Sequence, residues 1–436
     1  MEEQKNKRIR NNHTDHKKKR RNKIALTWSV VILILSLLIA GGIYLRIDEK
    51  VMPFVSGLLP DSGVVSDAKT EDIANDTSTN TSESDVIESS DESQVNAQAE
   101  ETPDTTIVFT GDIELSTYAQ RNYDAKGIDG LVTEPLRQEL EGADILEVNN
   151  EFCFSTRGTP APDKQYTFRV NPSYVSALTD LGVDVAGLAN NHVLDYGKEA
   201  LTDTFTTLSD AGIQYTGAGD SVEDASKLVT IEKNGKTFGF LAASRVIPVG
   251  SWNVENSQPG VFTCYDTTAL CNAISAARSQ VDYLFVCVHW GTEHTDVLTD
   301  YQRPNAHAYI DAGADAVIGA HSHCLQGIEY YNGKPIFYSL GNFIFNETID
   351  STMAVKITVP GTEENSTSTE NGVSTESNIS DIRVSLLPAT ASSATTSLAS
   401  EEKAASVYSY LMSISDTVEI DEAGNVVEKS GTAVQE

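Results

Sequence analysis

The chain has 436 residues, long enough for one large or two ordinary domains, and its formal net charge is −32. Because 63 acidic side chains face only 31 basic ones, an extended nucleic-acid surface is an unfavourable partner, and we expect no nucleic acid. Five cysteines, none of them in a CxxC pair, exclude a disulfide scaffold. Cys264 and Cys271 could be bridged, and buried thiols are the alternative.

A basic segment and a long apolar run open the chain. Residues 1–23 carry ten bases and three acids, whereas residues 24–45 form 22 residues without a charge. About 20 apolar residues span a bilayer as a helix. A cleaved signal peptide is the alternative, but its apolar core is usually only about 7 to 15 residues long. The positive-inside rule then predicts a single-pass anchor in the cell membrane, with a cytoplasmic N-terminus and an extracellular main domain.

Composition divides the remainder of the chain. Residues 61–104 contain 13 acids, one lysine and no aromatic residue, so they cannot bury enough apolar surface to offset their chain entropy. We therefore expect a disordered acidic stalk over 46–104. Residues 105–360 alternate short apolar runs with helical patterns, which is typical of an α/β domain. The other divisions that we expect are a low-complexity loop at 361–380, a final strand and helix packing on the domain at 381–425, and a disordered tail at 426–436.

Helix signals are clear at three places. Asn171 and Pro172 make a cap and first turn, and Gly182 ends the helix that follows. A second helix is predicted over 198–211, where apolar residues recur on one face. A third is predicted to begin at Ser400.

Polar side chains follow five of the apolar runs at the point where each run ends. Ligands in open α/β sheets gather outside the carboxyl ends of the strands, so these ends could converge on one crevice although they are far apart in sequence. The residues concerned are Asp112 and Glu114, Glu151, Asn191 and His192, His289, and His321 and His323.

The residue types at these ends indicate metal chemistry. Imidazole, carboxylate and amide oxygen donors suit Mn, Fe, Zn or Mg. Two ions sharing a carboxylate, roughly 3.5 to 4 Å apart, can clamp the attacking and leaving oxygens of a phosphoester. His321 and His323 would point to the same side of an extended strand. His192, beside a ligating Asn191, could protonate the leaving oxygen or hold the phosphate.

A structural interpretation of these residues is the alternative. A single histidine at a strand end is often just hydrogen-bonded, but here several buried polar groups in one region would each need a partner, which favours a metal site. His294 and His307 follow no apolar run, and we interpret them as surface or supporting residues. Asp195 and Gly197 indicate a turn at a helix start.

Six blocks resemble, in sequence order, the landmarks of the CapA-like poly-gamma-glutamate capsule biosynthesis proteins. The resemblance covers about residues 105–345 and implies the fold of the calcineurin-like metallophosphoesterases, to which that family is similar. That fold is a four-layer α/β/β/α sandwich of two mixed sheets. The blocks are GDIEL, NNE ending at Glu151, LANNHVLDYG, VHWGTEH, GADAVIGAHSH and IFYSLGNFIF.

The resemblance also implies roles for single residues. Asp112 takes the place of the first metal-binding Asp, Glu151 that of the bridging carboxylate, and Asn191 that of the Asn in the asparagine-histidine motif. His192 would be the catalytic histidine. Glu114 stands where metallophosphoesterases carry a histidine, and is a further candidate ligand through oxygen. The remaining metal ligands would be His289, His321 and His323.

Two functions follow as hypotheses. The first is a metal-dependent hydrolase of the metallophosphoesterase type, holding one or two ions of Mn, Fe, Zn or Mg and acting on a phosphoester or an anionic polymer. The second is a non-catalytic polymer-binding or scaffold subunit. In both, the resemblance implies partnership with other capsule synthesis or export subunits. No Gly-rich phosphate loop followed by lysine is present, so we do not assign the chain an ATP-driven ligase step.

Overall fold

The computed structural model of the chain describes residues 102–254, 258–361 and 382–430. The expected basic tail, membrane anchor, most of the stalk and most of the low-complexity loop lie outside these ranges. Within them, no helix combines the length and apolar character that crossing a membrane requires.

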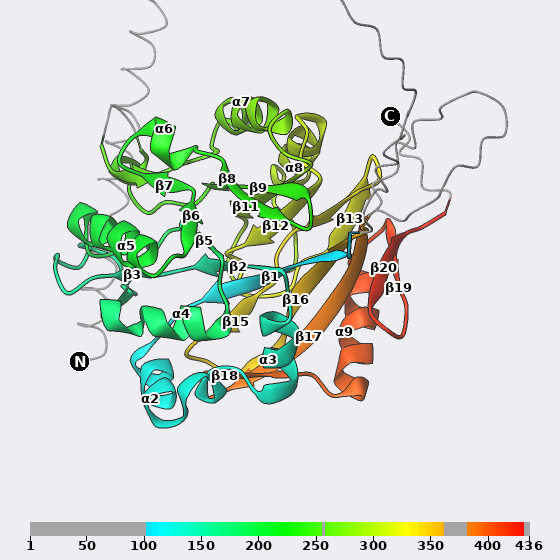
Figure 1. The fold of residues 1–436 in the computed structure, drawn as a ribbon, viewed down its shortest axis with the longest axis horizontal. Helices are drawn as coiled ribbons and strands as arrows, with labels where there is room; N and C mark the ends of the chain where they lie inside the picture. The colour runs from blue at the N-terminus through cyan, green and yellow to red at the C-terminus, as the bar shows by residue number, and fades with distance from the viewer. Residues whose placement is uncertain (1–101, 255–257, 362–381, 431–436) are drawn as a thin grey trace, which may run out of the picture. The chain divides into compact units, whose positions relative to one another are not determined.

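The larger of the two main sheets has ten strands and mixes parallel with antiparallel pairs (Figure 1). Its order is β19-β20-β17-β16-β1-β2-β5-β6, with β15 beside β1 and β18 beside β17. The strands β1, β2, β5 and β6 run parallel, and β16 pairs antiparallel with both β1 and β17. The bounds are β1 (Thr105–Ile113), β2 (Ile145–Asn150), β5 (Val185–Gly187), β6 (Gln214–Thr216), β15 (Asn342–Ile344), β16 (Ile349–Val359), β17 (Arg383–Ser392), β18 (Thr395–Leu398), β19 (Val418–Ile420) and β20 (Asn425–Glu428).

The second sheet has six strands in the order β13-β14-β12-β11-β9-β8 and is also mixed. The strands β9, β11, β12 and β14 are parallel, while β8 and β13 pair antiparallel at the two edges. Two strand pairs, β3 with β4 and β7 with β10, lie outside both sheets. The bounds are β3 (Cys153–Phe154), β4 (Arg169–Val170), β7 (Ala218–Gly219), β8 (Val229–Lys233), β9 (Lys236–Ser244), β10 (Gly260–Val261), β11 (Tyr283–His289), β12 (Ala316–Ala320), β13 (Ile328–Tyr331) and β14 (Lys334–Phe337).

The helices form where the sequence predicts them, with one difference at a helix start. Asn171 caps the expected helix and Gly182 ends it in a left-handed conformation, but its first turn is a 3-10 helix before α4 begins. Gly197 and Ser400 stand at the N-terminal caps of α5 and α9. The bounds are α2 (Thr117–Lys126), α3 (Glu134–Glu141), the 3-10 turn (Pro172–Val175), α4 (Ser176–Leu181), α5 (Lys198–Asp210), α6 (Val222–Ala225), α7 (Thr267–Arg278), α8 (Gln302–Asp311) and α9 (Glu401–Ser413).

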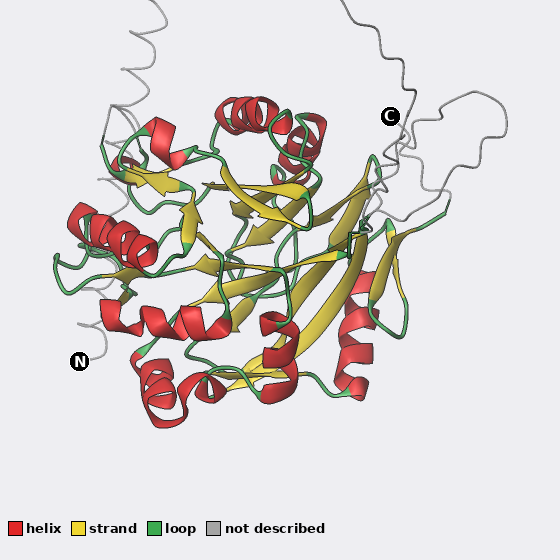
Figure 2. Cartoon of the chain, viewed as in Figure 1, coloured by secondary structure: helices red, strands yellow, loops and turns green. Residues whose placement is uncertain are grey.

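The alternation of side chains along the strands determines how the sheets and helices pack. Ile107 and Phe109 of β1 face the core between the sheets, whereas Val108 faces the helices α2 to α5. Phe109 meets Phe285 of β11 edge to face at 5.2 Å, which joins the two sheets. The helices α7 and α8 cover the outer face of the second sheet (Figure 2). The mixed α/β class predicted from the sequence is confirmed.

The C-terminal part extends further than the sequence predicts. The expected final strand is β17, which runs to Ser392, and it continues through β18 before α9 begins. The tail that was expected to be disordered from residue 426 begins inside β20, which ends at Glu428. Val426 is buried and pairs with Val384 of β17, so the sheet holds this segment in place. All five cysteines, Cys264 and Cys271 included, are free thiols.

Candidate metal centre

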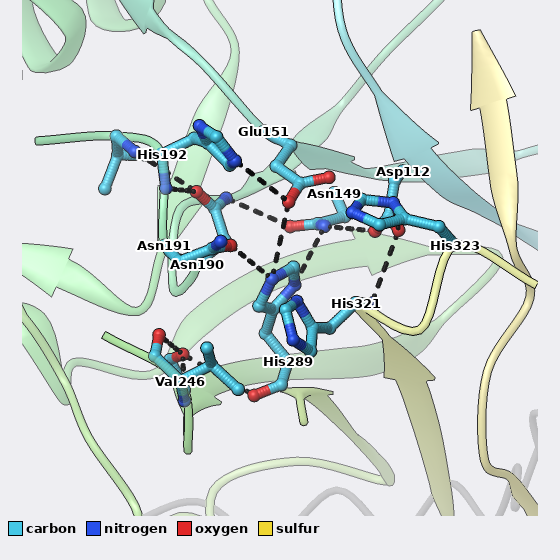
Figure 3. A network of polar contacts seen from close by, with 12 residues as sticks. Asp112, Asn149, Glu151, Asn190, Asn191, His192, Val246, His289, His321 and His323 are labelled. Atoms are coloured by element: carbon cyan, nitrogen blue, oxygen red, sulfur yellow. Dashed lines mark hydrogen bonds and ion pairs between the residues drawn. The ribbon is translucent and has the colours of Figure 1, made fainter. Parts of the chain in front are cut away.

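The five strand ends singled out by the sequence meet at one edge shared by the two sheets. Three of them belong to the larger sheet, at the ends of β1, β2 and β5, and two to the second sheet, at the ends of β11 and β12. Figure 3 shows side chains from all five pointing into one polar centre. The chain therefore brings together Asp112, Glu151, Asn191, His192, His289, His321 and His323.

Glu151 lies at the middle of this centre and is fully buried. Neither of its carboxylate oxygens accepts a hydrogen bond from any residue that the structure describes. The His289 Nε2 atom lies 3.5 Å from Glu151 Oε1, and the His192 Nε2 atom lies 3.9 Å from the same oxygen. Burial and the nearby charge of Asp112 raise the pKa of Glu151 well above its ordinary value.

Asp112 occupies one side of the centre. The Asn149 amide donates to Asp112 Oδ1 at 2.6 Å, and the backbone N–H of His321 donates to Oδ2 at 3.3 Å. The His323 Nδ1 atom lies 3.4 Å from the same Oδ2. Gly111 allows the end of β1 to reach this position, because a Cβ there would lie 1.8 Å from the Gly341 carbonyl oxygen.

Asn191 and His289 form the opposite side. The His289 Nε2 atom lies 2.8 Å from Asn191 Oδ1, and His289 Nδ1 lies 3.3 Å from the Asn149 amide nitrogen. Asn190 donates to Asn149 Oδ1 at 3.1 Å. The Asn149 amide thus connects the Asp112 side to the His289 side. Sequence reasoning gave Asn149 no role, although it stands beside Glu151 in the same strand-end block.

His321 and His323 approach the centre differently from the sequence prediction. The expected extended strand ends at Ala320, and the two histidines follow it in a turn with positive φ angles of 93° and 55°. The prediction that they lie on one side of an extended strand is therefore wrong, because neither residue belongs to the strand. One ligand atom from each still lies within 4.8 Å of the others and of Glu151, and the turn, rather than the pleat, aims them.

His192 is oriented by a residue that sequence reasoning assigned only to a turn. The His192 Nδ1 atom lies 2.7 Å from Asp195 Oδ2, and Asp195 is fully buried. Phe168 stacks on the imidazole with ring centroids 4.2 Å apart. The Nε2 atom faces Glu151. Asp195 is thus part of the centre, and its spacing of three residues from His192 was the available signal.

The centre opens into a cleft of about 590 Å³. Its wall includes His192 and His323, the buried Glu114 carboxyl, and His294, whose ring centroid lies 5.7 Å from that of His323. Glu114 is therefore near the centre, but it is not among the residues whose ligand atoms cluster with Glu151. Burial raises the pKa of Glu114 to about 8. Tyr118, Arg121, Tyr166 and Arg169 also line the cleft.

The histidines differ in charge because they differ in surroundings. Burial lowers the pKa of His289 well below its usual value, and together with the His323 charge it lowers that of His321 to about 4. Burial lowers the pKa of His192 as well. His323 is also buried, but its hydrogen bond to Asp112 and the charge of Glu151 outweigh burial and raise its pKa to about 10.

The donor set fits a divalent cation. Buried polar atoms in folded proteins nearly always have a partner, yet both Glu151 oxygens and His321 Nδ1 lack a hydrogen-bond partner among the described residues. These atoms are the kind that a cation would satisfy. Carboxylate oxygen, amide oxygen and imidazole nitrogen suit Mn, Fe, Zn or Mg.

The fold and this centre define an α/β protein with a candidate metal site at its strand ends. Similarity to known proteins identifies the family. The sequence model of the family described as bacterial capsule synthesis protein PGA_cap matches residues 106–347, more than half of the chain. The chain therefore belongs to this family. The resemblance to CapA-like poly-gamma-glutamate capsule proteins is thereby confirmed.

Two curated relatives and one solved structure illustrate the similarity. The chain is 35% identical over 243 residues to the PGA biosynthesis protein CapA of Bacillus subtilis (strain 168), covering 55% of this chain and 63% of that protein. It is 30% identical over 249 residues to the capsule biosynthesis protein CapA of Bacillus anthracis, covering 56% and 60%. A putative 5'-nucleotidase from Staphylococcus aureus has a TM-score of 0.37 at 14% identity, covering 62% of this chain and 56% of that one. The chain thus matches less than two thirds of the length of its curated relatives.

Proposed function

We propose that this chain is a membrane-anchored capsule synthesis protein whose folded part is a metal-dependent hydrolase of the metallophosphoesterase type. The observation that carries the hydrolase proposal is Glu151: a fully buried carboxylate without a hydrogen-bond donor among the described residues, next to His321 and His323. The family membership supports the role in capsule or other cell-surface polymer synthesis. Other capsule synthesis or export subunits are the proposed partners.

Two groups of side chains would hold divalent ions in this proposal. Asp112, Glu151, His321 and His323 would form one group, since ligand atoms of the last three lie within 4.8 Å of one another and His323 Nδ1 lies 3.4 Å from Asp112 Oδ2. Glu151, Asn191 and His289 would form the other, with His289 Nε2 lying 3.5 Å from Glu151 Oε1 and 2.8 Å from Asn191 Oδ1. When bound, the metal would polarise a phosphoryl oxygen and lower the pKa of water, so that hydrolysis can run near neutral pH.

The chain's own residues would position the substrate and move its protons. Burial lowers the pKa of His192, so its imidazole is mostly neutral near pH 7 and can accept a proton at Nε2. The same atom can then return the proton to the leaving oxygen. Asp195 holds Nδ1 and so keeps Nε2 facing Glu151. Arg121 and Arg169, which line the cleft, offer positive charge to an anionic phosphoester or polymer, in a chain whose net charge would repel it.

The test is hydrolysis of bis(p-nitrophenyl) phosphate by the purified full chain with added Mn²⁺. We expect Asp112→Asn and His323→Ala to lower kcat at least about 100-fold, because the first removes the negative charge of one metal-holding group and the second removes the imidazole of another. His307→Ala is the matched control, since His307 pairs with Glu329 at 2.7 Å outside the centre. The result would instead indicate a scaffold subunit if the folded wild-type chain binds no ion and hydrolyses nothing, and if the Asp112→Asn chain still supports capsule formation.

The anchor is a separate proposal, resting on the uncharged residues 24–45 and the basic residues before them. We expect the full chain to sediment with membranes and to resist extraction at high salt and at alkaline pH. Deletion of residues 1–45 should release it into the soluble fraction. A full chain that high salt alone extracts would contradict a spanning helix and indicate only surface association.

A further inference from the structure

One segment of the chain packs on the His192–Asp195 pair from outside. Residues 161–168 are the second part of the connection from β3 to β4 and contact the pair at both ends. The Ala161 N–H donates to the Asp195 carbonyl oxygen at 2.7 Å, and the Phe168 N–H donates to Asp195 Oδ2 at 2.7 Å. The Phe168 ring lies on the imidazole of His192. Lys164 stands between these two contacts. The segment is therefore attached to the centre as well as to the strands it connects.

The Lys164 ammonium group is buried among acceptors that belong to this pair and its neighbour. Its side chain is only 13% exposed, and it forms an ion pair with Asp195 Oδ1. Its Nζ atom lies 2.5 Å from the Asn191 carbonyl oxygen and 3.0 Å from His192 Nδ1. On its remaining side it faces the Trp252 ring, with the nitrogen 5.3 Å from the centroid. An ammonium group carries three hydrogens, so it can satisfy two oxygen acceptors and keep one hydrogen toward the indole.

The contacts at His192 Nδ1 decide which hydrogen bonds form. The Asp195 Oδ2 atom lies 2.7 Å from Nδ1, and a carboxylate oxygen can only accept, so Nδ1 must carry the hydrogen that it donates. Lys164 cannot then donate to Nδ1, and its hydrogens go to Asp195 Oδ1 and the Asn191 carbonyl. This leaves Nε2 as the bare nitrogen, and Nε2 is the atom that faces Glu151. One consistent set of hydrogen bonds therefore extends from Lys164 to the centre.

We propose that Lys164 is a positioning residue, which fixes the Asp195 carboxylate and the Asn191 carbonyl and through them holds His192 with Nε2 directed at Glu151. Without Lys164, Asp195 Oδ1 would lose its ion-pair partner inside the protein, and the carboxylate could rotate away from His192. The Asn191–His192 turn would lose the donor to its carbonyl at the same time. The kinetic consequence rests on the proposed hydrolase function, whereas the orientation of His192 does not.

The experiment compares full-length wild type with Lys164→Met and Lys164→Gln. Methionine fills a similar volume without a donor, while glutamine keeps two amide hydrogens. Lys356→Met is the matched control. Lys356 lies on β16 away from the centre, pairs with Glu139 of α3 at 2.7 Å, and has a side chain that is 28% exposed. Long-range ¹⁵N–¹H spectra of ¹⁵N-histidine-labelled, metal-free protein report the His192 tautomer, assigned by the signal that disappears in His192→Gln.

We expect wild type, Lys164→Gln and Lys356→Met to show His192 with hydrogen on Nδ1 and a bare Nε2. Lys164→Met should show a mixture of both tautomers, and its kcat with bis(p-nitrophenyl) phosphate should fall about 100-fold with KM changed less than about threefold. A folded Lys164→Met protein with the wild-type tautomer and kcat would overturn the proposal, as would hydrogen on Nε2 in wild type. If Lys164→Met does not fold, Lys164→Ala takes its place with the same expected mixture, and the wild-type tautomer in folded Lys164→Ala overturns the proposal. Failure of wild type to hydrolyse anything refutes the hydrolase function alone, since the spectra still report on Lys164.

Discussion

At the scale of single residues, the centre contains buried polar atoms, on Glu151 and His321, that have no hydrogen-bond partner among the described residues. The Glu151 carboxylate is fully buried and accepts no hydrogen bond from the described residues. A buried polar group without a partner costs about 1 to 3 kcal/mol, and a charged one more. Folded proteins retain such destabilising groups mainly at functional sites, and a bound cation would supply the missing partner of Glu151.

The first prediction concerns protons displaced by a metal. His323 has its pKa raised to about 10, so it carries a proton at pH 7 in the metal-free protein, and a histidine ligand must be neutral. Binding of Mn²⁺ at pH 7 should therefore release about one proton or more per ion, and the affinity should rise with pH. Calorimetry in two buffers of different ionisation enthalpy measures the release. His323→Ala should release fewer protons, and a binding enthalpy independent of the buffer in wild type would contradict this account.

A second prediction concerns Glu147, which lies in β2 next to a cavity of about 20 Å³. Burial raises its pKa to about 8, and its Oε1 atom has no hydrogen-bond partner in the described part of the chain. An acid whose pKa is higher in the folded state than in the unfolded state does not lower the free energy of unfolding at a pH below its unfolded pKa. Above that pH it lowers the free energy of unfolding progressively, until the pH reaches the folded pKa. The free energy of unfolding should thus fall by roughly 3 kcal/mol between pH 5 and pH 8 through this group alone.

Glu147→Gln should remove that part of the pH dependence, because an amide does not ionise. Urea unfolding of metal-free wild type and variant at pH 5 and pH 8 tests this. Glu419→Gln on the exposed side of β19 is the control and should leave the wild-type slope unchanged. An equal slope in wild type and Glu147→Gln would show that Glu147 keeps an ordinary pKa.

At the scale of secondary structure elements, the end of β1 depends on a close backbone approach. A Cβ at Gly111 would lie 1.8 Å from the Gly341 carbonyl oxygen, and the Asp112 N–H donates to that same oxygen at 3.0 Å. Gly111→Ala must push β1 away from this turn and move Asp112. We expect it to destabilise the protein by several kcal/mol, about 3 or more, and to weaken Mn²⁺ binding.

Gly250→Ala is the matched control for Gly111→Ala. Gly250 lies outside β1, and a Cβ at this position would meet nothing within 4 Å. Urea unfolding gives the stability and calorimetry with Mn²⁺ gives the affinity of both variants. If Gly111→Ala unfolds and binds like Gly250→Ala, the β1 end does not depend on this approach.

The sequence predicts the strand ends of the centre well because each buried strand is an apolar run that stops at a polar residue. It could not predict how His321 and His323 are aimed, since their positive φ angles arise from the turn after β12. Lys164 could not be predicted for another reason, whereas Asp195 had a signal in its spacing of three residues from His192. Residues 161–168 show no helical or strand period, and only the fold places them on His192. Likewise β20 has too few apolar residues to predict a strand, and its pairing with β17 holds it.

At the scale of the whole molecule, the centre exists because two separate sheets end at a common edge. The larger sheet supplies Asp112, Glu151 and Asn191, and the second sheet supplies His289 and the histidines after β12. Neither sheet alone offers both the carboxylates and the imidazoles of the donor set.

Anomalous diffraction from crystals of the full chain grown with Mn²⁺ tests the central claim most directly. We predict a peak bounded by Glu151, His321 and His323, with ligand distances of roughly 2.0 to 2.3 Å, and loss of that peak in Asp112→Asn or His323→Ala crystals. A well-ordered wild-type centre without a peak, or a peak only at surface carboxylates elsewhere, would contradict the claim that these strand ends converge to hold a metal ion.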